Sequence, residues 1–290
     1  MKQPDLREDT NLIDRFFPIN VFTNVCRDKT VLWLHWHDGV EIIQMLEGRA
    51  VFKIEDRQYE AAPGDILVVN SGFLHYGEAA EDGPVVYQAI VFGRALLAGA
   101  SPDPRHDRCI QPFLTGQRLF PEKIASGDGG YVEMSAALAL LLQEFARKRE
   151  GYELAVKAAL QLFTLAAYRL SGLQDRTRRD FAANSERFKL LLEHIDRGYG
   201  SRITVEHAAR IVALSPCHFC KTFKKLTGRT FVEFMNLYRV NKAAALLRET
   251  GLSVTEIAAS TGFCNVNYFD KVFKQCKRCS PARYRKEAAQ

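Results

Sequence analysis

Two different hydrophobic patterns divide the chain. Between residues 20 and 92, short apolar runs such as V-L-W-L-H-W-H, V-E-I-I-Q-M-L and V-V-Y-Q-A-I-V-F alternate with turn residues. The turns fall at Gly39, Gly48, Pro63-Gly64, Gly72 and Gly83-Pro84. Short strands at this spacing are typical of a β-sandwich or β-barrel, so we predict a β-barrel here.

Helical spacing replaces the strand pattern after residue 130. Apolar residues recur every three or four positions from 131 to 148 and from 152 to 170, and a short joint at Glu150-Gly151 separates the two stretches. This spacing predicts two helices in an antiparallel hairpin. The hairpin could pack only on the β-domain, or it could also form the seam of a homodimer.

A charged segment follows the hairpin. It reads G-L-Q-D-R-T-R-R-D-F-A-A-N-S-E and contains few large apolar residues, which is typical of a linker. We predict an N-terminal domain over residues 1–172, a linker over 173–185 and a second domain over 186–290.

The second domain contains an internal repeat. At an offset of 50 residues, H-F-C-K-T-F-K-K-L-T-G-R-T (218–230) aligns with Y-F-D-K-V-F-K-Q-C-K-R-C-S (268–280). A short helical stretch with Ala-Ala and then a turn precede each copy. A small helix, a tight turn and a second helix make a helix-turn-helix, so the repeat predicts two such units.

The second helix of each unit has an apolar and a polar face. Apolar side chains at i, i+4 and i+7 are expected to face inward: Phe219, Phe223 and Leu226 in one copy, and Phe269, Phe273 and Cys276 in the other. The opposite faces carry lysines, which neutralise phosphates, and Asn267, which could bind an adenine edge. A single basic face is usually only solvated, but lysines in register in two copies favour nucleic-acid binding.

Residues 231–248 connect the two units and contain neither Gly nor Pro. One continuous helix of this length would span about 27 Å, which suits two helices in successive turns of the major groove. The C-terminal region resembles the DNA-binding domain of the AraC/XylS family of transcription regulators, most densely in I-A-A-S-T-G-F-C-N-V-N-Y-F-D-K-V-F-K and S-P-A-R-Y-R. The resemblance implies that helices at about 215–226 and 265–276 enter double-stranded DNA.

The predicted DNA-binding residues lie on these two helices and at their N-terminal ends. They are Ser215, Pro216, Cys217, His218, Lys221, Thr222, Lys224, Lys225, Asn265, Val266, Asn267, Tyr268, Lys271 and Lys274. The chain departs from the family pattern at Ala213 and Arg278, where glycine is usual. We expect Arg278 either to adopt a left-handed backbone conformation at some cost or to end its helix differently.

The charge distribution supports a polyanion partner for the C-terminal domain. The chain has a net charge of +6, but residues 184–290 hold 19 basic and 9 acidic side chains (+10), while residues 1–183 hold 21 and 25 (−4). Nucleic acid is therefore favoured over a membrane surface. Because no run of about 18 apolar residues or apolar leader is evident and the seven cysteines suggest reduced thiols, we predict a cytoplasmic protein without membrane contact.

A histidine motif lies in the β-domain. His35, His37, Glu41 and Gly48 follow the pattern H-x-H-x3-E-x6-G, and Gly64, Asn70, Gly72 and His75 follow downstream. Together they resemble the two motifs of the cupin superfamily, a jelly-roll barrel. The resemblance implies that His35, His37, Glu41 and His75 would be metal ligands in a metal-binding member. Asn70 and Ala79 depart from the pattern, which usually has proline and asparagine there.

Three interpretations of the histidine motif remain open. It could form a metal-free effector pocket, bind a divalent metal that serves sensing, or consist of structural histidines. The first is favoured because AraC/XylS regulators commonly carry a cupin-like sensor. In that pocket Trp33 and Tyr76 would join the four motif residues as effector-binding residues, since aromatic rings can stack on a sugar.

These observations predict a multidomain α and β protein. A cupin-type β-barrel with a helical hairpin would bind the effector and form the dimer, and an all-α domain with two helix-turn-helix units would bind DNA. The predicted function is transcription activation by a homodimer that responds to a sugar or related metabolite and contacts RNA polymerase. No catalytic residue is predicted, and a divalent metal is the one cofactor considered.

Two alternatives come from other classes of protein. One is a cupin metalloenzyme, an oxygenase or isomerase, with an appended DNA-binding domain. The other is an architectural DNA-binding protein whose barrel binds no ligand.

Overall fold

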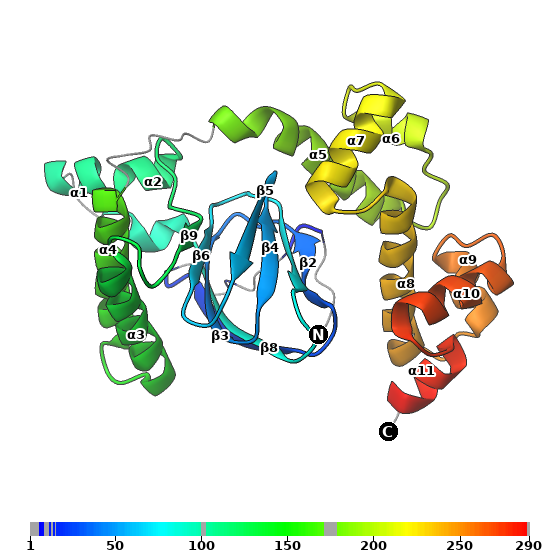
Figure 1. Ribbon diagram of the computed structural model, residues 1–290, viewed down its shortest axis with the longest axis horizontal. Coiled ribbons are helices and arrows are strands. Elements are labelled where there is room, and N and C mark those ends of the chain that lie inside the picture. Colours follow the sequence, from blue (N-terminus) through cyan, green and yellow to red (C-terminus); the bar gives the residue numbers. More distant parts are fainter. Residues whose placement is uncertain are drawn as a thin grey trace. The chain divides into compact units, whose positions relative to one another are not determined.

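The computed structural model describes residues 6–8, 12, 14, 16–99, 103–170 and 179–288. The chain forms two compact units, Met1–Ser185 and Glu186–Gln290, and Figure 1 shows the β-rich and the helical part. Residues 173–178 of the predicted linker lie outside the described residues. Residues 179–185 belong to helix α5 (Arg179–Gly198).

The N-terminal unit contains two β-sheets. The larger has the order β1-β8-β3-β6-β9 and the smaller β2-β7-β4-β5. The larger sheet consists of β1 (Ile19–Cys26), β8 (Val85–Phe92), β3 (Val40–Glu47), β6 (Ile66–Val69) and β9 (Lys123–Ile124). The smaller consists of β2 (Thr30–His35), β7 (His75–Ala79), β4 (Ala50–Ile54) and β5 (Arg57–Ala61). Within the described residues the sheets are not joined into a closed barrel, so the predicted cupin-type fold takes a two-sheet jelly-roll form.

The core of this unit has two layers because β3 is buried on both faces. Ile43 and Met45 lie in the cluster between the sheets, together with Phe52 of β4. Ile42 belongs to a second cluster, on the outer face of the larger sheet. Burial on both faces explains why the apolar residues Ile42 and Ile43 are adjacent in β3 rather than separated by a polar one.

Helices cover that outer face. The predicted hairpin is present as α3 (Tyr131–Arg147) and α4 (Tyr152–Leu170), which lie side by side (Figure 1). Leu138 and Leu160 belong to the same core cluster as Ile42 and Ile90 of the sheet. Three short helices precede the hairpin: η1 (Arg94–Leu97), α1 (Pro104–Cys109) and α2 (Gln111–Thr115).

Asn70, one of the departures from the cupin pattern, has a structural role. Its buried side chain donates from Nδ2 to the carbonyl oxygen of Phe120 at 3.1 Å and accepts from the Phe120 amide at 2.9 Å. Proline could make neither bond. The asparagine therefore fastens the segment before β9 to the loop that follows β6.

The C-terminal unit contains the two predicted helix-turn-helix units. They are α6 (Val205–Ile211) with α7 (Pro216–Thr227), and α9 (Val254–Ser260) with α10 (Val266–Lys277). The predicted continuous helix between them is α8 (Phe231–Glu249), which begins with a capping box formed by Thr230 and Glu233. Helix α11 (Pro281–Ala288) ends the described chain.

The positions that lack the family glycine adopt left-handed backbone conformations. Ala213 has φ 53° in the first turn, where the second unit has Gly262 with φ 84°. Arg278 has φ 59° after α10, where the first unit has Gly228 with φ 74°. The first of the two outcomes expected for Arg278 is thus confirmed, and Ala213 bears the same kind of strain.

In the described part of the chain, no helix combines the length and apolar character needed to cross a membrane.

Candidate effector site and nucleic-acid interface

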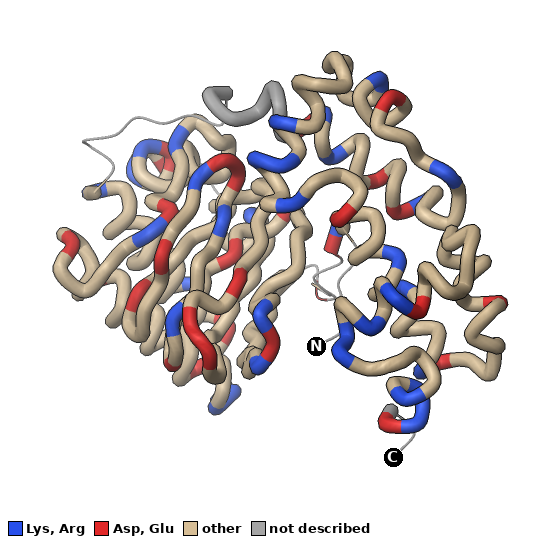
Figure 2. The backbone as a smooth tube through the Cα atoms, turned by 45° about the vertical axis from the view of Figure 1, so that its right-hand side comes forward, with Lys and Arg blue, Asp and Glu red and all other residues tan. Residues whose placement is uncertain are grey.

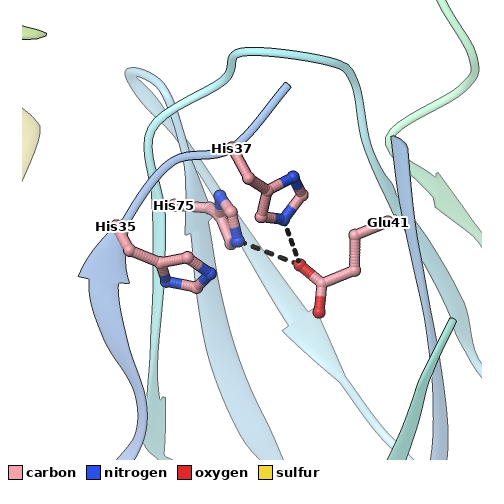
Figure 3. Close-up of side chains that lie close together, drawn as sticks. All are labelled: His35, His37, Glu41 and His75. Atoms are coloured by element: carbon pink, nitrogen blue, oxygen red, sulfur yellow. Dashed lines mark hydrogen bonds and ion pairs between the residues drawn. The ribbon is translucent and has the colours of Figure 1, made fainter. Parts of the chain in front are cut away.

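Four residues of the cupin-like motif come together at one end of the jelly roll. We refer to His35, His37, Glu41 and His75 as the tetrad (Figure 3). His35 ends β2 opposite His75 at the start of β7, while Glu41 lies on β3 of the other sheet. All four are buried, and their ligand atoms lie within 4.8 Å of one another. The tetrad therefore bridges the two sheets.

Backbone carbonyls orient the three imidazole rings. Nδ1 of His35, His37 and His75 lies 2.7, 3.1 and 2.9 Å from a carbonyl oxygen of Trp33, Gly39 and Phe73, respectively. A carbonyl oxygen can only accept, so each Nδ1 carries a proton. In the neutral form of each ring, Nε2 then has a free lone pair.

Carboxylates lie against each Nε2. Oε2 of Glu41 is 3.3 Å from Nε2 of His37 and 2.9 Å from Nε2 of His75, whereas Nε2 of His35 is 3.0 Å from Oε2 of Glu8. Nε2 of His75 has no hydrogen bond of good geometry despite the short distance. The carboxylate of Glu41 and the lone pair of His75 Nε2 are therefore close to each other without a hydrogen bond between them.

The pKa values within the tetrad diverge. Burial raises the pKa of Glu41, but the hydrogen bond with His37 and the closeness of His75 outweigh it and hold this pKa well below its usual range. Burial and the nearby His35 lower the pKa of His75 to about 4. At neutral pH the lone pair of His75 therefore faces an ionised carboxylate, and a cation or a hydrogen-bond donor between them would relieve the repulsion.

The tetrad fits a divalent metal on its donor chemistry. Three imidazole nitrogens and one carboxylate suit zinc or a neighbouring first-row metal. The hydrogen bonds from each Nδ1 to a carbonyl oxygen are of the kind that orient metal-binding histidines. Nε2 of His75 makes no hydrogen bond to a described residue, so its lone pair could bind a metal ion. Such an ion would supply positive charge to neutralise Glu41 and a Lewis acid to bind oxygen atoms of an effector.

The two predicted aromatic residues are placed differently. Tyr76 pairs with Lys53 in the smaller sheet, while His75 pairs with Ile54. Successive residues of a strand point to opposite faces, so Tyr76 lies on the face opposite the tetrad. Trp33 contributes its backbone carbonyl to His35, and its side chain is half-buried.

The predicted DNA-binding helices have the expected two faces, with one exception. Phe219, Phe223, Phe269 and Phe273 are buried, but Cys276 is exposed, and Val272 fills the core instead. The exposed residues of the predicted set are Ser215, Pro216, Cys217, His218, Lys221, Lys224, Lys225, Asn265, Val266, Asn267, Tyr268, Lys271 and Lys274, and Thr222 is half-buried. Lys and Arg positions are frequent along the helices of this unit (Figure 2).

Several of these side chains already have partners within the protein. Ser215 and Asn265 cap α7 and α10 by accepting hydrogen bonds from backbone amides. The hydroxyl of Tyr268 accepts from Asn236 of α8 at 2.9 Å, and Lys274 pairs with Asp270 at 2.6 Å. Among the described residues no carboxylate pairs with Lys221 or Lys271, which remain the strongest candidates for phosphate contacts.

Two residues near these sites were not anticipated. Glu8 reaches His35, and Arg239 of α8 binds the loop before α6. Neither belongs to a repeated or spaced pattern in the sequence. Only the fold shows their proximity.

Comparison with known proteins agrees with both halves of this description. An AraC-like ligand binding domain model matches residues 25–163, and a helix-turn-helix domain model matches residues 208–287. The HTH-type transcriptional regulator YdeC of Bacillus subtilis is 27% identical over 254 residues, 87% of this chain and 86% of that protein. The arabinose operon regulatory protein of Escherichia coli is 25% identical over 83% of this chain and 78% of that protein.

A solved structure matches over most of the chain. ToxT of Vibrio cholerae with a bound unsaturated fatty acid is 12% identical, with a TM-score of 0.44, over 92% of this chain and 94% of that one.

Proposed function

Because the chain belongs to the AraC/XylS family of DNA-binding transcription regulators, we propose that its N-terminal domain, residues 1–172, binds a sugar or related metabolite and thereby alters DNA binding by residues 186–290. The buried tetrad carries this proposal, because it concentrates polar groups inside the ligand-binding domain. The relatives are transcription regulators, so the chain is a regulator and not a cupin metalloenzyme.

DNA would be bound by α7 and α10 in successive turns of the major groove. Lys221 and Lys271 occupy equivalent positions of the repeat and are both exposed. Equivalent lysines would contact phosphates in two turns of one duplex, while Asn267 could bind a base edge. The protein would act in the cytoplasm, where this DNA is found.

A sugar suits the chemistry of the tetrad. Glu41 can accept hydrogen bonds from hydroxyl groups, and each imidazole Nε2 can accept another. A hydroxyl placed between His75 and Glu41 would donate to one of two acceptors that otherwise face each other. The arabinose operon regulatory protein, whose name refers to a sugar, is consistent with this ligand class.

A divalent metal is the second candidate ligand. The same facing acceptors, and the vacant Nε2 of His75, favour a cation. The metal could act alone as the signal or hold an organic effector.

The protein would activate transcription if, once bound to DNA, its C-terminal domain contacted RNA polymerase. The bifunctional transcriptional activator AdaA of Bacillus subtilis is 37% identical over 102 residues, 35% of this chain and 48% of that protein.

A homodimer would form through the outer face of the hairpin. Leu154 and Leu162, eight residues apart on α4, are 74% and 53% exposed there.

A combined ligand and DNA experiment tests the proposal. The full chain would be screened by thermal shift against sugars and divalent metal salts, and its target would be selected from random duplex DNA. We expect one class of sugar to raise the melting temperature and to change affinity for the selected duplex. A chain that selects no sequence, or whose DNA affinity responds to no compound that stabilises it, would contradict the proposal.

A further inference from the structure

A short N-terminal segment is fastened beside the tetrad. Residues 6–8 run parallel to the end of β2 through a bridge between Arg7 and Trp36. The amide of Trp36 donates to Leu6 at 3.0 Å, and the amide of Glu8 donates to Trp36 at 2.9 Å. Leu6 is buried, with 1% of its surface exposed. The segment is therefore held by backbone bonds and by burial of an apolar side chain.

Charged contacts on the outer side fix its direction. The guanidinium of Arg7 pairs with Asp38 at 2.8 Å and lies over the Trp36 ring at 4.9 Å. With Arg7 turned outward, the neighbouring Glu8 turns toward the protein. Its Oε2 lies 3.0 Å from Nε2 of the buried His35, and its side chain is 33% exposed. Glu8 thus lies between the tetrad and solvent.

This placement completes a pattern within the tetrad. Nε2 of His37 and Nε2 of His75 both approach Glu41, whereas Nε2 of His35 approaches Glu8. The ring centroid of His35 lies only 4.1 Å from that of His75. Glu8 is therefore a second carboxylate at the edge of a cluster whose donor atoms already lie within 4.8 Å of one another.

We propose that Glu8 is a fifth donor to a divalent cation held by the tetrad, so that cation binding stabilises the docked segment at residues 6–8. The inference rests on the metal form of the proposed effector site. Two carboxylates would balance the two charges of the ion, which one carboxylate and three neutral imidazoles do not. Because Glu8 comes from outside the two sheets, losing the ion would weaken the attachment of the segment.

Cobalt(II) chloride is a suitable probe, because the absorption spectrum of bound Co²⁺ reports its coordination number. The full chain, freed of metal by a chelator, would be titrated as wild type, Glu8→Gln and Glu47→Gln. Glu47 is an exposed residue of β3 and controls for the loss of a carboxylate elsewhere on the domain. We expect Glu8→Gln to weaken Co²⁺ binding about 10–100-fold and to change the spectrum, while Glu47→Gln matches wild type.

Trypsin cleavage after Arg7 provides an independent measurement. Arg7 is 58% exposed at its side chain, so docking of the backbone should control the cleavage rate. Co²⁺ should slow this cleavage in wild type and Glu47→Gln, with little effect in Glu8→Gln. Mass spectrometry of the products identifies the site.

Three results would overturn the inference. Equal Co²⁺ affinity and equal spectra for wild type and Glu8→Gln would show that Glu8 contacts His35 but does not bind the cation. Cleavage after Arg7 that ignores Co²⁺ in wild type would exclude the coupling. A wild type that binds no Co²⁺ would remove the metal site altogether, whereas the proposed function would fail only if organic effectors also left DNA binding unchanged.

Discussion

Arg239 in the middle of α8 forms a hydrogen bond with Tyr199 in the loop before α6. Its Nε donates to the carbonyl oxygen of Tyr199 at 2.9 Å, and another guanidinium nitrogen donates to Ser201 at 2.7 Å. The same loop approaches the second helix-turn-helix, since a Cβ added to Gly262 would lie 2.8 Å from the Tyr199 oxygen. Arg239 therefore joins the connecting helix and the start of the first unit at the point where the second unit packs.

Arg239→Ala should destabilise the C-terminal unit and weaken DNA binding. The partly buried carbonyl oxygen of Tyr199 would lose a charged donor, at a cost of about 1–3 kcal/mol, while the exposed oxygen of Ser201 could bind water instead. Denaturant unfolding and affinity for the selected duplex measure the two effects. Arg197→Ala is the control, because Arg197 is exposed and contacts Glu193 one turn earlier on the same helix, at 3.2 Å from its carbonyl oxygen and 3.5 Å from its carboxylate. Equal stability of the two variants would show that Arg239 does not join the units.

Glycine at the left-handed positions should stabilise the protein. Ala213→Gly and Arg278→Gly remove a Cβ that is unfavourable at φ 53° and 59°, and each should add roughly 0.5–1 kcal/mol to the free energy of unfolding. Gly262→Ala should do the opposite, and more strongly, since its Cβ would also meet two backbone oxygens at 2.8 and 2.9 Å. Chemical denaturation of the three variants measures this order. A loss of stability in Ala213→Gly would mean that backbone strain there is negligible.

Strong local patterns made much of the fold predictable from the sequence. The hairpin, the continuous α8 and both helix-turn-helix units follow from apolar spacing and from the repeat, and the tetrad follows from its motif spacing. Strands whose apolar pattern is weak could not be predicted in this way. For example, β5 reads R-Q-Y-E-A and has few apolar residues. It lies at the edge of its sheet, where one side of the strand has no neighbouring strand.

Features that depend on distant contacts could not be read from the sequence. Cys276 was expected to face inward because it follows Phe269 and Phe273 at helical spacing, but α10 ends one residue later and Val272 fills the core. Tyr76 was expected to join the tetrad because its ring could stack on a sugar, although strand alternation turns it to the other face. Glu8 approaches His35 only through the backbone bridge to Trp36.

Changing the exposed leucines of α4 to aspartate should separate the proposed homodimer. Leu154→Asp and Leu162→Asp each place a charge on the outer face of the hairpin, and burying an unpaired charge in an interface is costly. Analytical ultracentrifugation should show a shift from dimer to monomer with little change in thermal stability. Leu190→Asp on α5, where the leucine is 58% exposed, serves as the control. A dimer that survives both changes must use another surface.

Lys221→Ala and Lys271→Ala should weaken binding to the selected duplex and make it less dependent on salt. A lysine at a phosphate releases about one counterion, so each change should lower the slope of log affinity against log salt by about 1. Lys274→Ala should have a smaller effect, because Lys274 already pairs with Asp270 at 2.6 Å. Lys157→Ala on α4 is the control and should bind DNA like wild type. Fluorescence anisotropy at several salt concentrations measures all four. If Lys221→Ala and Lys271→Ala both keep the wild-type slope, α7 and α10 do not contact phosphates through these lysines, and the assignment of the two DNA-binding faces is wrong.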